Sequence, residues 1–133
     1  MPLIENRNLV YTDIDLSFTT NPFTKDIATL LNDSAVKRSI RHAIFFNKYD
    51  IPFNNTYYST IKRILFEPLS NVSSSILANA IKSVIEKLDK RVQIKSVDVK
   101  INSQEDGYDV TITFSIIYLK DDNVMKLYLQ RIR

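Results

Sequence analysis

The chain has 133 residues, of which 44% are hydrophobic and 25% charged, and its net charge is +3. This composition is that of an ordinary globular domain, and it excludes a disordered or fibrous protein. The single glycine, Gly107, and the lack of cysteine exclude glycine-rich phosphate-binding loops, disulfides and thiolate metal sites. No apolar run approaches the ~20 residues of a membrane span. We therefore expect one domain over residues 1–133, with residues 1–12 as a flexible N-terminal arm and with no cofactor, metal ion or membrane partner.

In chain order, residues 25–31 come first and predict either a short strand or an extended lead-in. A helix is predicted over 35–46, because residues typical of N-caps precede it and apolar residues recur at helical spacing. The cap candidates are Asn32, Asp33 and Ser34, and the core candidates are Val36, Ile40, Ala43 and Ile44. Residues 47–58 indicate a loop, and residues 59–66 form a short amphipathic run that Pro68 closes.

The second half of the chain predicts a long helix followed by strands. Residues 69–90 have the strongest period of 3.6 residues. Its core candidates are Ile76, Ala80, Ile81, Val84, Ile85 and Leu88. The period then changes to two in runs that start at Val92, Tyr108 and Met125, and a slip between Ile94 and Val97 indicates a β-bulge.

Turn residues at 102–107 and 120–123 separate the three alternating runs, which therefore predict a three-stranded antiparallel meander. Helices that precede the strands indicate an α+β domain, with the helices packed on the C-terminal sheet. Such a sheet has two edges, and each edge can accept a strand from another chain.

Candidates for catalysis are few, and we predict that the protein is not an enzyme. Glu67 lies between apolar residues, which could raise the pKa of a general acid, and Asp13 with Asp15 forms a close acidic pair. Their simpler interpretation is a helix end and solvated acids. His42 has no nucleophile near it in sequence and is more typical of a helix surface than of a catalytic base.

Positive charge is concentrated between residues 34 and 66. The basic residues there are Lys37, Arg38, Arg41, Lys48, Lys62 and Arg63, against Asp50 as the one acid. With Tyr57 and Tyr58 close by, this segment could bind phosphates and stacked bases. No nucleic-acid motif accompanies it, so a solvated face or a contact for an acidic protein is the preferred interpretation.

The junction between the long helix and the first strand carries Asp89, Lys90 and Arg91 in place of a glycine or proline. Together with DLSF near the N-terminus, VKRSIRHAIFF and ILFEPLS, this order resembles the small baseplate wedge protein of contractile-tailed bacteriophages, a family shared with the TssE-type baseplate component of type VI secretion systems. That family has Glu-Pro-Arg at this junction, so the acid type and the arginine are kept here and the proline is lost.

The resemblance implies a structural subunit of the tail baseplate, in the virion and made in the host cytoplasm, with six copies from sixfold symmetry. Its implied partners are the larger wedge subunits, bound at Asp89, Lys90 and Arg91, and the tail sheath protein, which would start from a sheet edge within 92–132. Lys37, Arg38, Arg41, Lys62 and Arg63 form a possible second interface, and no specific nucleic acid is expected. A local ion pair between Arg91 and Asp89, or with the helix C-terminus, is the alternative role for that arginine. A baseplate-associated peptidoglycan hydrolase, or a nucleic-acid-binding module, remains the alternative function.

Overall fold

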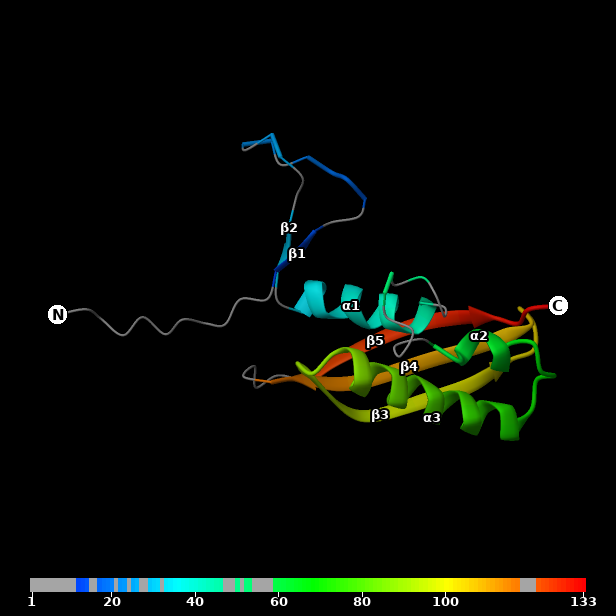
Figure 1. Cartoon of the computed structure of the whole chain (residues 1–133). Coiled ribbons are helices and arrows are strands. Elements are labelled where there is room, and N and C mark those ends of the chain that lie inside the picture. Colours follow the sequence, from blue (N-terminus) through cyan, green and yellow to red (C-terminus); the bar gives the residue numbers. More distant parts are fainter. Residues whose placement is uncertain are drawn as a thin grey trace.

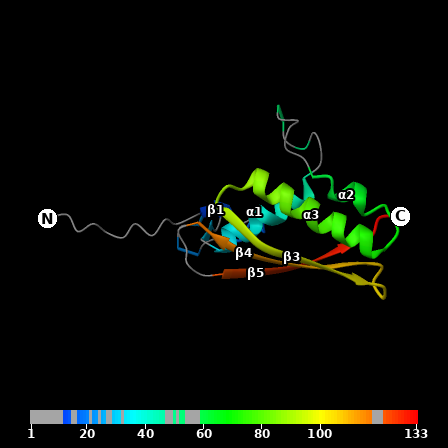
Figure 2. The same ribbon diagram turned by 90° about the horizontal axis from the view of Figure 1, so that it is seen from below.

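The computed structural model describes residues 12–14, 17–20, 22–23, 25–26, 29–31, 33–46, 50, 52–53, 59–117 and 122–133. Two layers form the main body, with helices on one face of an antiparallel sheet (Figures 1 and 2). The helices are α1 (Asp33–Phe45), α2 (Ile61–Ile64) and α3 (Asn71–Leu88), and the strands of the sheet are β3 (Val92–Asn102), β4 (Gly107–Ile116) and β5 (Asp122–Gln130). The predicted α+β domain with a C-terminal meander is therefore confirmed.

The sheet has the order β3-β4-β5, and alternation of its side chains separates a core face from a polar face. The core face of β4 consists of large hydrophobic and aromatic residues, each at most 1% exposed: Tyr108, Val110, Ile112, Phe114 and Ile116. The register of β3 with β4 shifts between Ile94 and Ser96, so the predicted bulge is confirmed. The opposite face exposes charged residues such as Asp98 and Asp109, and the helices therefore cover only one side.

α1 supplies the core residues that its period predicts. Val36, Ile40, Ala43 and Ile44 are all buried against the sheet and the other helices, and the helix begins at Asp33 within the predicted cap region. α3 is capped by Ser70, whose Oγ accepts a hydrogen bond from the Ser73 N–H at 3.0 Å. Asp33 places a negative charge in the first turn of α1, and Ser70 satisfies a backbone N–H in the first turn of α3. Both helix starts are therefore stabilised by side chains.

The core face of α3 differs from the prediction at one position. Ile76 is 46% exposed, and Leu77, next to it in the chain, is fully buried together with Ile81 and Ile85. The expectation that Ile76 belongs to the core is therefore wrong. Ala80 and Leu88 are half-buried at the margins of the same face.

Short strands β1 (Thr12–Ile14) and β2 (Thr29–Leu31) pair antiparallel with each other near the start of α1 (Figure 1). This confirms the strand alternative for the last part of residues 25–31. Residues 1–11 of the predicted arm and most of the predicted loop at 47–58 lie outside the described residues. Residues 118–121 also lie outside the described residues. The turn predicted at 120–123 is wrong for its last two residues, because Asp122 and Asn123 belong to β5.

The C-terminal segment is tied to the turn that joins β3 to β4. Asp106, in the left-handed region with φ 53°, pairs with Arg131 at 3.8 Å and with Arg133 at 2.8 Å. The Ile132 N–H also donates to the Leu65 carbonyl at 2.8 Å. These bonds hold the end of β5 beside α2.

Candidate functional site

The corner, which we define as Asp89, Lys90 and Arg91, joins α3 to β3 without any left-handed residue. Asp89 has extended backbone angles (φ −125°, ψ 103°), while its N–H still donates to the Ile85 carbonyl at 2.9 Å. The chain therefore passes from helix directly into strand conformation. A glycine is needed only when the residue after a helix takes positive φ, which explains why this corner contains none.

Asp89 is the polar centre of the corner, and it is only 4% exposed. One carboxylate oxygen, Oδ1, accepts hydrogen bonds from the Arg91 N–H and from Arg91 Nε, each at 3.0 Å. The other, Oδ2, accepts from Arg91 Nη2 at 2.9 Å and from the Ser39 hydroxyl at 2.8 Å. Burial by itself would raise the pKa of this carboxyl, but the hydrogen bonds from Arg91 and Ser39 outweigh burial and hold the pKa below its ordinary value.

The other two corner residues differ in their surroundings. The Arg91 carbonyl accepts a hydrogen bond from the Ile117 N–H at 2.8 Å, and its side chain is 33% exposed. Lys90 is exposed and donates only to the Glu86 carbonyl, at 3.3 Å, among the bonds that the structure assigns to it. The local ion pair that the sequence allowed for Arg91 is therefore formed, and contact of the corner with a partner stays a prediction.

The predicted second interface divides between two hollows. Lys37, Arg38 and Arg41 of α1 line the first, which we call the basic hollow, with a volume of about 550 Å³. Its remaining lining residues are Ser34, His42, Val124, Met125 and Lys126. Lys62 lines the other hollow, and Arg63, although exposed, is in the lining of neither. Lys126 was missed by the sequence interpretation, since only the packing of α1 beside β5 brings it into the same lining.

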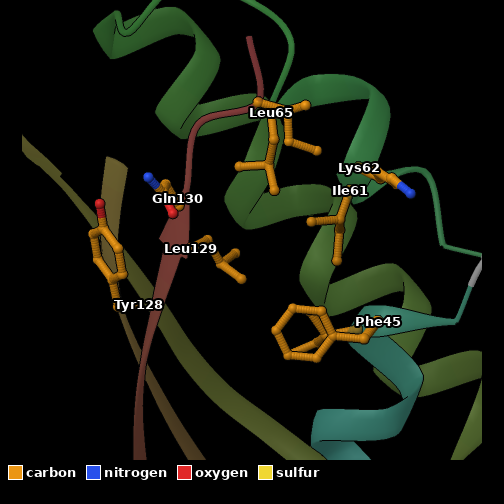
Figure 3. A pocket seen from close by; sticks show the side chains of 9 residues that line it. Phe45, Ile61, Lys62, Leu65, Tyr128, Leu129 and Gln130 are labelled. Carbon is orange, nitrogen blue, oxygen red and sulfur yellow. The ribbon is translucent and has the colours of Figure 1, made fainter. Parts of the chain in front are cut away.

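The second hollow, which we call the apolar hollow, has a volume of about 520 Å³ and lies between the end of α1, α2 and the end of β5 (Figure 3). Its lining residues are Ile44, Phe45, Ile61, Lys62, Leu65, Tyr128, Leu129, Gln130 and Ile132. Figure 3 shows Leu129 on the helix side of β5, with Tyr128 and Gln130 on the other side. Phe45 remains 54% exposed although its ring borders this space.

The candidate catalytic residues are not gathered into one site by the described part of the chain. Glu67 is exposed just after α2 and lines neither hollow, and His42 is half-buried with its ring 5.8 Å from that of Phe46. Asp15, Tyr57 and Tyr58 lie outside the described residues.

The described residues contain no group of three or more His, Asp or Glu side chains that could hold a metal ion. Among the helices that the structure describes, none is long and apolar enough to cross a membrane.

Three solved structures share this fold over most of their length. A chain of the anti-feeding prophage baseplate, solved with sixfold symmetry, superposes with a TM-score of 0.71 at 17% identity, covering 85% of this chain and 90% of that one. A crystallised protein from Geobacter sulfurreducens, described provisionally as a tail lysozyme, gives 0.70 at 13% identity, covering 80% and 98%. A chain of the post-contraction pyocin R2 baseplate gives 0.61 at 13% identity, with the same coverage of 80% and 98%.

No protein-family model matches the sequence. No curated protein matches it either. The likeness is therefore one of three-dimensional fold, and it covers 90% and 98% of the two baseplate chains. The fold of this chain is one that occurs in the baseplates of contractile tail systems, in agreement with the resemblance noted from the sequence.

Proposed function

We propose that this protein is a structural subunit of a contractile-tail baseplate. The observation that carries the proposal is the fold shared with chains of two such baseplates, of which 90% and 98% are covered. In this role the protein resides in the virion tail baseplate after synthesis in the host cytoplasm. Six copies per baseplate would follow from the sixfold symmetry applied to the anti-feeding prophage assembly.

The finer part of the proposal concerns partners. The larger wedge subunits bind at the corner, and the first ring of the tail sheath starts from an edge of the sheet. Support for the corner comes from its rigidity, because Asp89 ties Ser39 of α1 to Arg91 and leaves Lys90 at the surface. A fixed exposed charge beside a half-buried guanidinium can contact a partner's carboxylates or carbonyls with little loss of side-chain freedom.

The test is co-expression with the neighbouring large wedge subunit, followed by size-exclusion chromatography. Lys90→Glu is the cleanest change, since it reverses an exposed charge and leaves the bonds of Asp89 intact. We expect the complex to form with the unchanged protein and to be lost with Lys90→Glu. Arg91→Ala should also weaken it, but its effect must be separated from loss of the Asp89 ion pair by measuring stability.

Lys82→Glu is the matched control, because Lys82 is an exposed lysine of α3 away from the corner. A complex that survives Lys90→Glu and a folded Arg91→Ala would discard the corner as the binding site. No complex with any baseplate subunit would contradict the proposed function itself.

A second candidate, a peptidoglycan hydrolase of the baseplate, is favoured by one observation. The Geobacter sulfurreducens neighbour is described provisionally as a tail lysozyme. Glu67 is the candidate acid, although it is exposed and borders neither hollow. Release of soluble fragments from purified peptidoglycan by this protein, abolished by Glu67→Gln, would support the hydrolase, and no release would leave the structural role.

A further inference from the structure

The strands β1 and β2 form a hairpin that stands clear of the two-layer body (Figure 1). We call it the hairpin arm and define it by its described residues, 12–14, 17–20, 22–23, 25–26 and 29–31. Its two strands have three residues each, and they contact each other and α1. A two-stranded ribbon is marginally stable in water, so little of the arm's stability comes from the ribbon itself.

Large apolar side chains of the hairpin arm are exposed to solvent. Ile14 is 55% exposed, Phe18 is 65% exposed and Phe23 is 94% exposed. Exposed apolar residues that are scattered singly need no explanation, whereas a concentration of them marks an interaction surface. The hairpin arm therefore has the composition of an element that binds another molecule.

The backbone of the arm also has two residues in the left-handed region. Phe18 has a φ of 53° and Lys25 a φ of 57°. This conformation is unfavourable for a bulky aromatic residue, because its Cβ approaches the backbone carbonyl oxygen. Strained conformations persist where their surroundings hold them, and they are concentrated at ligand clamps and switch regions. Phe18 is mostly exposed, so a bound partner would supply the support that solvent does not.

Phe23 is held by a stretch of backbone with restricted freedom. It follows Pro22, whose ring fixes φ at about −65°, and both residues are exposed in a turn. Binding costs less when the residue that binds has little freedom to lose. Aromatic side chains bury a large area, and they are common among the residues that dominate the binding energy of interfaces. Phe23 is therefore suited to be the main anchor, with Phe18 as the second.

The charges close to these phenylalanines cancel. Lys25 and Asp26 are both exposed, and they are the charged residues among the described positions between β1 and β2. A nucleic acid or an anionic membrane surface would require an excess of cations here. A protein surface with apolar pockets for phenylalanine rings instead fits an arm of this composition.

We propose that the hairpin arm inserts Phe18 and Phe23 into apolar pockets of a different protein subunit of the baseplate. The inference rests on the proposed function for the place where that subunit is found. Its chemistry rests on the exposure, the backbone conformation and the charge of the arm. The contact is separate from both hollows, since none of the arm's described residues lines either of them.

The first experiment is photo-cross-linking in tail particles purified from the cells that produce them. The photoreactive analogue p-benzoylphenylalanine replaces Phe23 in the full chain. In a matched variant it replaces Phe66, which is 54% exposed just after α2 on the main body. Mass spectrometry then identifies the cross-linked residues. We expect position 23 to cross-link to apolar residues of a different baseplate subunit, and position 66 not to reach those residues.

Substitutions measure how much the two rings contribute. Phe18→Ser with Phe23→Ser should lower the amount of this chain in purified particles by about tenfold or more. The urea midpoint of the isolated chain should stay unchanged, because both side chains are exposed. Phe66→Ser is the control and should leave incorporation unchanged. Phe18→Met with Phe23→Met keeps large, adaptable apolar side chains and should retain most of the incorporation.

Each contrary result overturns the proposal. These results are cross-links from position 23 only to this chain, to a second copy of it or to nucleic acid, full incorporation of the double serine variant, or an equal loss with Phe66→Ser. Absence of the unchanged chain from tail particles would contradict the proposed function, and with it the partner named here. Particles that contain the chain but lack the expected cross-links would overturn the arm contact alone, so the two failures can be told apart.

Discussion

The corner and the basic hollow both concentrate charge, and the surroundings of that charge differ. At the corner, the carboxylate of Asp89 is buried and accepts four hydrogen bonds from Arg91 and Ser39. In the basic hollow, cations of α1 and β5 line an open space whose described lining has no carboxylate. Removing one partner of a buried charge should cost stability, because it leaves the other group without its counter-charge, whereas removing charge that lines an open hollow should cost little.

The largest expected effect is at the centre of the corner. Asp89→Ala removes the acceptor of four hydrogen bonds and leaves the Arg91 guanidinium and Ser39 hydroxyl without it. We expect the free energy of unfolding to fall by about 3 kcal/mol, measured by urea denaturation. Lys90→Ala is the neighbouring control and should change it by less than about 0.5 kcal/mol, since Lys90 is exposed. Equal effects of the two changes would contradict the division between buried and exposed corner residues.

A somewhat smaller effect is expected where the start of β4 meets the end of β5. Gly107 is buried, and a Cβ there would lie 2.6 Å from the Leu129 carbonyl oxygen and also against the Tyr128 hydroxyl. Gly107→Ala should therefore displace β5 and lower the free energy of unfolding by about 2 kcal/mol. Thermal unfolding followed by circular dichroism measures the loss. Thr111→Ala, at a half-buried position of the polar face, is the control, and a Gly107→Ala variant as stable as the unchanged protein would show that β5 can move away at little cost.

Acid should weaken the corner more than the basic hollow. The folded-state pKa of Asp89 is lowered, so the folded protein binds fewer protons there than the unfolded chain does. The stabilisation is complete above the unfolded pKa of about 3.9 and is lost as the pH falls through the folded value. In urea denaturation at a series of pH values, Asp89→Asn should show a smaller acid-induced loss than the unchanged protein. Asp98→Asn, on the exposed polar face, serves for comparison, and identical acid dependence of the unchanged protein and Asp89→Asn would refute the role of Asp89.

The smallest effect on stability is expected from the basic hollow. Lys37→Glu with Arg41→Glu changes partly or fully exposed side chains, and among the described residues it removes the ion pair of Lys37 with Asp33, which spans 3.6 Å at the surface. The free energy of unfolding should change by less than about 1 kcal/mol. A larger loss in urea denaturation would mean that these cations support the fold, and the contrast with the corner would then disappear.

Much of the fold could be predicted because its signals are local. The alternation in β3, β4 and β5 repeats every two residues, and the slip after Ile94 marks the bulge within a single strand. The core face of α1 follows in the same way from Val36, Ile40 and Ile44. The prediction that Ile76 belongs to the core was wrong, because the adjacent apolar residues Ile76 and Leu77 both fit a helical period. Only packing against the sheet decides which of the two is buried.

The candidate sites were less predictable because their members are distant in sequence. The sequence marks Asp89 and Arg91 as an unusual helix end, but it does not connect Asp89 with Ser39, which is 50 residues earlier. The basic segment predicted an interface from Lys37 and Arg41, and its Lys62 proved to line a different hollow.

The sequence by itself determined the two longer helices, the three C-terminal strands in their order, the bulge and the unusual charged corner, because each depends on neighbours within one or two turns of chain. Only the tertiary structure decided that Arg91 pairs with Asp89 at a buried site, that Lys126 joins the cations of α1, and that β5 is a regularly paired edge strand. Those outcomes depend on how the helices pack on the sheet. Such packing brings together side chains whose separation in sequence carries no periodic signal.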